Sequence, residues 1–232
     1  MRKIVLFLLF DLILIPVIGQ SVSKQLISNN SQIEAINDST VSDIDGNVYH
    51  TVTIGTQTWM IENLNTTRFR NGDKIPNIKV DSIWEAINSA AYCEYNNDTE
   101  IAEKIGKLYN WYSIADSRNL APMGWHVSTY ADWTILDEFL KINGYNNEGL
   151  LSENKESNEK IAKTLASKSD WMKCKDKGTI GNDLTTNNLS GFKGLPGGYR
   201  HTNGSFRGYK KIGYWWNYSE TDNLLAWSRS LS

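Results

Sequence analysis

The chain has 232 residues, with 24 Lys and Arg against 26 Asp and Glu, and its formal net charge is -2. This balance excludes the strongly basic surface that nucleic acid or an anionic membrane would attract, so we expect neither as a partner. The compositional anomaly is aromatic: there are nine Trp and eleven Tyr. We expect most of them to fill a core of short strands, and a few to line a face that binds sugar or peptide.

The first 19 residues have the pattern of a secretory signal peptide. Residues 1–3 are a basic head, residues 4–15 are apolar except for one Asp, and small or apolar residues occupy 17–19. The pattern predicts cleavage between Gly19 and Gln20. A membrane anchor is the alternative, but the apolar run is shorter than the roughly 20 residues that span a bilayer. We therefore expect a secreted or cell-surface protein with no stable membrane span after cleavage, and no lipid-modified cysteine.

Residues 20–40 are rich in Ser, Asn and Gln and show no sustained period, which is typical of a flexible linker. One domain then covers residues 41–232. Asp45-Gly46-Asn47 is a turn signal, and the alternation after it predicts a hairpin over residues 48–61. In that hairpin Trp59 and Ile61 share one face and Met60 lies on the other.

Helices are expected in four places. Residues 74–106 are loop-rich with a helical turn near 83–87, and apolar spacing predicts a buried helical segment over 108–115. The clearest helix has Ser128 or Thr129 as its N-cap, and Asp132 lies three residues beyond Thr129 in a capping-box position. We expect Trp133, Leu136, Phe139 and Leu140 to line its inward face, and Asn143-Gly144 to end it. A second short helix is expected over 159–167.

Glycines and aromatic residues alternate densely between residues 191 and 229. Glycine allows tight turns, and Tyr, Trp and Phe favour the half-buried surface of a sheet, so short antiparallel strands are predicted here. The whole layout is an α+β domain with one or two helices packed on small antiparallel sheets, joined by long loops.

The two cysteines, Cys93 and Cys174, could form a disulfide in an exported protein, or remain two free thiols. A bridge across so long a loop would stabilise the fold by about 3 to 5 kcal/mol. The histidines His50, His126 and His201 are widely scattered in the sequence. We expect no metal and no cofactor.

Several separated motifs resemble one known family. They are DGNVYHTVTIGTQTWMIENL at 45–64, AYCEYNND at 91–98, LYNWYS at 108–113, NLAPMGWHVSTYADWTIL at 119–136, GLPGGYR at 194–200, and GYWWNYSE with AWSRSL near the end. In that order they resemble the Fibrobacter succinogenes major paralogous domain, a family of exported bacterial proteins. The resemblance implies a distant likeness to the C-type-lectin-like fold, which also includes the formylglycine-generating enzymes.

The chain departs from that family pattern in its cysteine framework and at its end. Glu94 follows Cys93 where an aromatic is usual, Ser128 replaces a proline, and Asn217 and Tyr218 replace small hydroxyl residues. The family continues into a final strand of the form GFSVRC, whereas this sequence stops at Ser232. We therefore expect a domain that lacks its last strand, with Cys174 as a substitute partner for Cys93.

We expect no catalytic residues. The reactive cysteines of formylglycine-generating enzymes have no counterpart near the C-terminus, and no G-x-S-x-G elbow is present. His126 is interpreted as a partly buried structural histidine, and Asp132, Asp137 and Glu138 as the solvated face of a helix. A hydrolytic enzyme stays the second alternative.

Binding of a carbohydrate, or of another extracellular ligand, is the function that the residues favour. Sugar sites combine aromatic rings with amide and carboxylate groups, and one short stretch supplies both kinds. The candidate ligand-binding residues are Trp215, Trp216, Asn217, Glu220 and Asp222, with Tyr199 and Arg200. On a strand the two Trp point to opposite faces, so one belongs to the core and the other faces outward or packs beneath a loop. The first alternative is an adhesin-like structural module whose partner is a protein.

Overall fold

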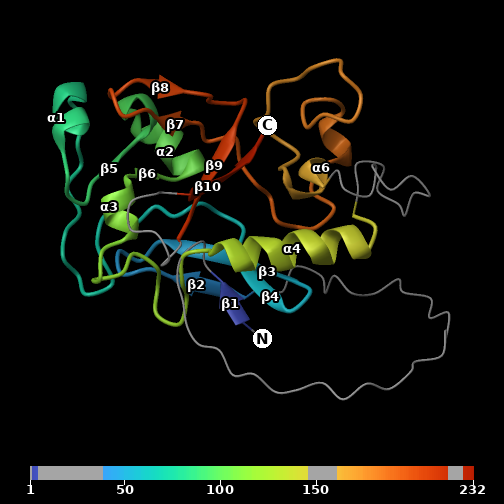
Figure 1. Ribbon diagram of the computed structural model, residues 1–232, viewed down its shortest axis with the longest axis horizontal. Helices are drawn as coiled ribbons and strands as arrows, with labels where there is room; N and C mark the ends of the chain where they lie inside the picture. The colour runs from blue at the N-terminus through green and yellow to red at the C-terminus, as the bar shows by residue number, and fades with distance from the viewer. Residues whose placement is uncertain (1, 5–38, 146–160, 219–226) are drawn as a thin grey trace.

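The computed structural model describes residues 2–4, 39–145, 161–218 and 227–232 (Figure 1). In the view of Figure 1, a sheet built on the predicted hairpin forms the lower part of the molecule, and the long helix α4 lies across it. Short helices and strands form the upper part. Most of the predicted signal peptide and linker lies outside the described residues.

The main sheet is built on a hairpin of β3 (Val48–Ile54) and β4 (Gln57–Met60), as the sequence predicts. Their two-residue turn begins at Gly55, whose φ of 61° is a conformation that glycine adopts without strain. β2 (Thr40–Ser42) pairs antiparallel with β3, and β1 (Arg2–Ile4) pairs parallel with β4. The strand order is β1-β4-β3-β2.

Alternation along β4 divides the hydrophobic interior into two clusters. Trp59 is 0% exposed and packs in the first cluster, with its ring centroid 5.2 Å from that of Trp133 and 5.5 Å from that of Phe192. Its neighbour Met60 belongs to the second cluster, together with Phe69. The predicted placement of Trp59 and Met60 on opposite faces of the hairpin is confirmed.

The helix α4 (Tyr130–Ile142) begins at the predicted N-cap. The Thr129 side chain accepts a hydrogen bond from the Asp132 backbone N–H, and the Asp132 carboxylate accepts one from the Thr129 backbone N–H. This capping box satisfies two backbone donors that the helix itself leaves unpaired. The buried side of the helix consists of the predicted Trp133, Leu136 and Leu140, with Phe139 partly buried beside the same cluster.

The interpretation of the α4 carboxylates as a solvated face is wrong for two of the three. Asp132 is buried because the capping box turns its carboxylate back toward the preceding loop, where Oδ2 lies 3.0 Å from His126 Nε2. Asp137 Oδ2 accepts a 2.6 Å hydrogen bond from Arg229 Nη2. Glu138 is exposed. His126 is partly buried, as expected.

Between the hairpin and α4 the chain forms short elements around a two-stranded sheet. In chain order they are α1 (Asp81–Ala86), β5 (Tyr92–Cys93), η1 (Tyr95–Asn97), α2 (Thr99–Ile105), β6 (Leu108–Tyr109) and α3 (Trp111–Ile114). The helix predicted over 108–115 is therefore wrong in its first half. Leu108 and Tyr109 pair with β5, and the Asn110 side chain caps a shorter helix by accepting from the Ser113 N–H.

The C-terminal part carries the predicted short antiparallel strands, in two separate sheets. Its elements are α6 (Ala162–Leu165), η2 (Leu184–Thr186), β7 (Tyr199–Arg200), β8 (Phe206–Arg207), β9 (Gly213–Asn217) and β10 (Trp227–Leu231). β7 pairs with β8, and β9 pairs with β10. A parallel bridge between Gly198 and Gly213 joins the two sheets at one point.

Cys93 and Cys174 are free cysteines, so the predicted disulfide is wrong. Cys93 is buried in β5, whereas Cys174 is exposed on a loop, where its Sγ lies 2.8 Å from Thr179 Oγ1. Burial raises the pKa of the Cys93 thiol to about 11, which leaves it protonated near neutral pH.

These elements make an α+β fold with small sheets, as predicted. Among the helices in the described ranges, none has the length and the apolar character that crossing a bilayer requires.

Candidate functional site

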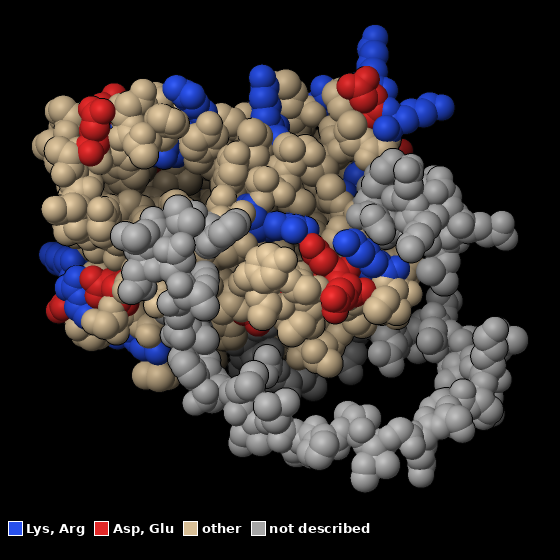
Figure 2. Space-filling model, in the orientation of Figure 1, with Lys and Arg blue, Asp and Glu red and all other residues tan. Residues whose placement is uncertain are grey.

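A pocket of about 650 Å³ opens between the small elements on one side of the molecule. Its walls come from the segment after β4, from α1, β6 and α3, and from β7 and β9. Figure 2 shows a shaded hollow left of centre in this face, surrounded mostly by uncharged residues. The volume lies within the range of pockets that enclose a small organic ligand.

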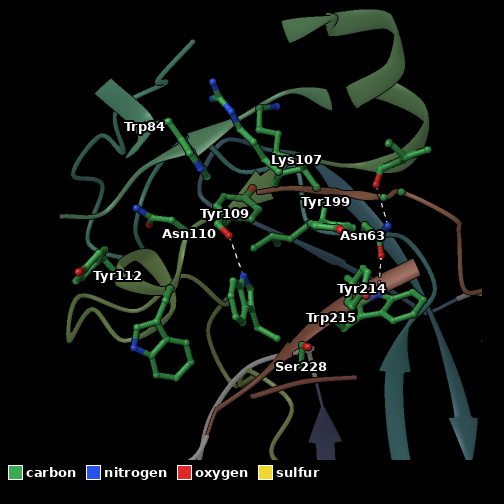
Figure 3. Close-up of a pocket in the computed structure, with 18 of the residues that line it drawn as sticks. Asn63, Trp84, Lys107, Tyr109, Asn110, Tyr112, Tyr199, Tyr214, Trp215 and Ser228 are labelled. Atoms are coloured by element: carbon green, nitrogen blue, oxygen red, sulfur yellow. Dashed lines mark hydrogen bonds between the residues drawn. The ribbon is translucent and has the colours of Figure 1, made fainter. Parts of the chain in front are cut away.

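Besides the half-buried Trp111 and Trp216, four aromatic side chains from four different elements line the pocket and keep part of their surface open to solvent. Tyr112 of α3 is 45% exposed and Tyr214 of β9 is 41% exposed. Trp84 of α1 and Tyr199 of β7 are half-buried. Figure 3 shows Trp84 and Tyr112 on one side of the pocket and Tyr214 on the other. Exposed rings on opposite walls can contact two faces of one ligand.

The bridge between β7 and β9 explains why two of these rings meet. Gly198 pairs with Gly213, so the residues that follow them, Tyr199 and Tyr214, lie side by side. Their ring centroids are 4.9 Å apart at an interplanar angle of 71°, an edge-to-face contact. The pair therefore forms a preorganised aromatic wall from strands that are separate in the sequence.

The two adjacent tryptophans of β9 also line the pocket, but neither is an outward ring. Trp215 is 7% exposed and belongs to the first hydrophobic cluster, and its Nε1–H donates to Asn63 Oδ1 at 3.0 Å. Trp216 packs half-buried against the second cluster, and its Nε1–H donates to the Tyr109 carbonyl at 2.8 Å. Trp215 therefore faces the first cluster and Trp216 the second, on opposite faces of β9. Tyr214, on the same face as Trp216, keeps 41% of its surface exposed, so this face is only partly covered and Trp216 is a half-buried ring of the pocket wall rather than a fully outward one.

The remaining candidate residues from the sequence are placed as follows. Asn217 is buried at 5% exposure on β9 and does not line the pocket. Glu220 and Asp222 lie outside the described residues. Arg200 lines the pocket, yet its side chain is 0% exposed. Of the seven candidates, the pocket brings together Tyr199, Arg200, Trp215 and Trp216.

Most polar side chains of the pocket wall are held by intramolecular hydrogen bonds. Asn63 Nδ2 donates to the Ile105 carbonyl at 2.8 Å (dashed in Figure 3), and Asn110 Nδ2 donates to the Ser89 carbonyl at 2.8 Å. Glu62 accepts a 2.7 Å hydrogen bond from the His50 backbone N–H. These bonds make the wall rigid and leave few charges for a ligand to meet.

Lys107 is the one amine of the pocket wall among the described residues. Its Nζ donates to Asn65 through both the carbonyl and the side-chain oxygen, and lies 5.7 Å from the centroid of the Tyr92 ring. Burial lowers the pKa of Lys107, against the opposing influence of Glu94 and other carboxylates. The Lys107 amine is therefore engaged in hydrogen bonds within the protein.

The His126–Asp132 pair, which could suggest acid–base chemistry, lies outside the pocket lining. Burial opposes ionisation of Asp132, but hydrogen bonds from His126 and Thr129 outweigh it and hold the pKa of that carboxyl below its usual value. The pair belongs to the start of α4. In the described ranges, no three His, Cys, Asp or Glu side chains gather as metal ligands would.

Sequence reasoning missed Trp84, Tyr112 and Tyr214. Tyr112 lies within the buried helical segment predicted over 108–115, and the start of α3 at Trp111 turns it outward instead. Trp84 stands alone in a polar stretch, and a lone Trp on a short helix is the signal that could have marked it.

The family model of the Fibrobacter succinogenes major domain (Fib_succ_major) matches residues 52–232. No curated protein and no solved structure matches the chain, so the likeness to C-type lectins stays a prediction. The matched range contains every residue of the pocket wall. This protein belongs to the Fibrobacter succinogenes major domain family.

Proposed function

We propose that the protein is an exported, non-catalytic binding module whose pocket takes a neutral oligosaccharide. Export rests on the signal-peptide pattern of residues 1–19. The cleavage that this pattern implies would remove the edge strand β1 and leave β4, β3 and β2 of the main sheet. The binding function rests on the pocket and its rings.

The main support for the proposal is that the exposed rings carry polar groups without partners in the described part of the chain. Tyr112, Tyr199 and Tyr214 and the indole of Trp84 have no hydrogen-bond partner for their O–H or N–H groups among the described residues. A pyranose presents an apolar face that packs on aromatic rings and hydroxyl groups that accept and donate hydrogen bonds. The rings offer both at once.

Charge favours a neutral sugar over an acidic one. Arg200 and Lys107 are engaged inside the protein, and Glu62 is held by His50. Glu85 is the exposed charge of the described pocket wall, and it is negative. An acidic oligosaccharide would meet this carboxylate without a free cation to offset it.

The experiment is isothermal titration calorimetry with cellohexaose, xylohexaose and mannohexaose, and with tetragalacturonate as the acidic contrast. We expect at least one neutral oligosaccharide to bind, and Tyr112→Ala and Tyr214→Ala each to weaken that binding by about tenfold, equal to about 1.4 kcal/mol. Tyr130→Ala is the matched control, because Tyr130 is 70% exposed on α4 and outside the pocket.

Binding of none of the neutral probes, or equal binding by the two pocket variants and wild type, contradicts the proposal. Capture of a protein partner through the same rings would favour the adhesin-like alternative. Release of shorter sugars during the titration, detected by chromatography, would overturn the non-catalytic part. Two carboxylates of the pocket wall, Glu62 and Glu85, are the residues to replace in that case.

A further inference from the structure

Arg200 is the most completely engaged cation near the pocket. Its side chain is 0% exposed, and its Nε–H donates to the Gly204 carbonyl at 2.8 Å. Nη1 donates to the Ile78 carbonyl at 2.6 Å, and Nη2 donates to the Lys79 carbonyl at 3.1 Å and to Asp81 Oδ1 at 2.7 Å. A buried guanidinium needs such a complete set of acceptors, because leaving water is costly for a charge.

The same guanidinium also lies over two aromatic rings. Its Cζ lies 4.6 Å from the centroid of Trp84 and 4.7 Å from the centroid of Phe206. Phe206 continues into an aromatic contact with Tyr95 at 5.2 Å. Arg200 therefore joins Trp84 of α1 to the body of the protein through two cation–π contacts, one with Trp84 and one with Phe206.

The segment before α1 is also bound to β5 and η1, where the Ile78 N–H donates to the Tyr92 carbonyl and Asn97 Nδ2 donates to the Lys79 carbonyl. The helix α1 itself is weakly held. It has six residues, no side-chain cap and no buried residue, and a helix this short is unstable on its own. Figure 1 shows it projecting at the left edge of the molecule. Three of the four acceptors of Arg200 belong to α1 or to the two residues just before its N-cap.

The turn between β7 and β8 packs closely against α1, at Gly204 and Asp81. Gly204 has φ 87°, and a Cβ built there would lie 2.4 Å from Asp81 Cβ. Only glycine fits at this point, so the turn brings the Gly204 carbonyl and the start of α1 onto the same guanidinium.

We propose that Arg200 is a positioning residue of the pocket: it contacts no ligand and holds α1 so that the Trp84 ring stands at the pocket wall. This inference rests on the proposed function for its effect on binding, but the positioning itself can be measured without a ligand. It replaces the expectation, drawn from the sequence, that Arg200 binds the ligand directly.

The test is ¹⁹F NMR of protein labelled with 5-fluorotryptophan, in which Trp84→Phe assigns the Trp84 signal. In Arg200→Lys the Trp84 signal moves toward its position in urea-unfolded protein, because a lysine can neither stack on the ring nor reach all acceptors. The signals of the other tryptophans stay in place and report an intact fold. Arg207→Lys is the matched control, since Arg207 is exposed on the same hairpin.

Asp81→Asn is the second variant, because Asp81 is 65% exposed and its replacement leaves the core untouched. It moves the Trp84 signal in the same direction by a smaller amount, and it decides the matter if Arg200→Lys does not fold. A Trp84 signal unchanged in the folded variants overturns the inference.

The binding arm uses cellohexaose. Arg200→Lys weakens its binding by about fivefold, Trp84→Ala weakens it by a similar factor, and the double variant loses no more than either alone. Additive losses would mean that Arg200 acts apart from Trp84, and would overturn the positioning role. Where wild type binds xylohexaose or mannohexaose but not cellohexaose, the same variants are titrated with that sugar. Wild type that binds none of the three counts against the proposed function, while the ¹⁹F result still decides the role of Arg200.

Discussion

The cluster around Trp59 and the pocket contain the same types of aromatic residue in opposite environments. In the cluster, Trp59 and Trp133 are almost wholly buried, and their indole N–H groups donate to Gln57 and Ser128. In the pocket, Trp84 is half-buried, and its N–H has no acceptor among the described residues. Two features therefore distinguish rings that stabilise the fold from rings that are free to bind a ligand. One is the exposed fraction of the ring, and the other is whether its polar group has a hydrogen-bond partner in the protein.

The largest expected effect comes from removing a ring of the buried cluster. Trp59→Ala should lower the free energy of unfolding by about 3 to 5 kcal/mol, because it leaves a cavity between Trp133 and Phe192. Urea unfolding followed by circular dichroism measures it. A loss of less than about 1 kcal/mol would mean that this cluster does not carry the fold.

The next effect concerns the start of α4 and depends on pH. Asp132→Ala removes a capping partner and the acceptor of His126, and should cost about 2 kcal/mol near neutral pH. The pKa of Asp132 is lower in the folded protein than in the unfolded chain. Its contribution is therefore complete above the unfolded pKa and is lost as the pH falls through the folded pKa.

Urea unfolding at pH 6 and pH 3 tests this sign. The difference between wild type and Asp132→Ala should be smaller at pH 3. A difference that grows on acidification would contradict the hydrogen-bonded, ionised state of the carboxylate.

A smaller loss of stability is expected where the pocket meets the turn that holds α1. Gly204→Ala places a side chain in a left-handed conformation and against Asp81, at a cost of about 1 kcal/mol. Because the clash displaces α1, binding of cellohexaose should weaken more than stability does. Calorimetry and urea unfolding on the same sample give both values, and unchanged affinity would separate α1 from the pocket.

The smallest effect on stability is expected at the exposed rings. Tyr112→Ala and Tyr214→Ala should change the free energy of unfolding by no more than about 0.5 kcal/mol, because each ring keeps over 40% of its surface in solvent. A loss of stability as large as that of Trp59→Ala would show that these exposed rings stabilise the fold as the buried rings do.

Local signals predicted the hairpin and α4. Gly55 and the alternation around Trp59 determine the hairpin within one stretch of chain, and the Thr129–Asp132 capping box marks the start of α4. The family motifs are continuous stretches of sequence, two of which cover the hairpin and the start of α4, so membership could also be predicted.

The pocket could not be predicted in the same way, because its walls meet only through long-range contacts. Arg200 reaches Asp81 across 119 positions, and Trp215 reaches Asn63 across 152. The alternation of Trp215 and Trp216 was predicted correctly, but nothing local shows that Trp216 packs half-buried against a second cluster. The short helix α3 likewise depends on the pairing of β6 with β5, which turns Tyr112 outward.

We expect the exposed aromatic rings, and not the buried ones, to bind a neutral oligosaccharide. The most direct measurement is a ¹⁹F NMR titration of protein labelled with 3-fluorotyrosine, using the neutral hexasaccharides as probes. We predict that the signals of Tyr112, Tyr199 and Tyr214 shift together with a common dissociation constant, while that of Tyr130 on α4 stays in place. Shifts confined to Tyr130, or no shift of the three pocket tyrosines at saturating sugar, would contradict the account.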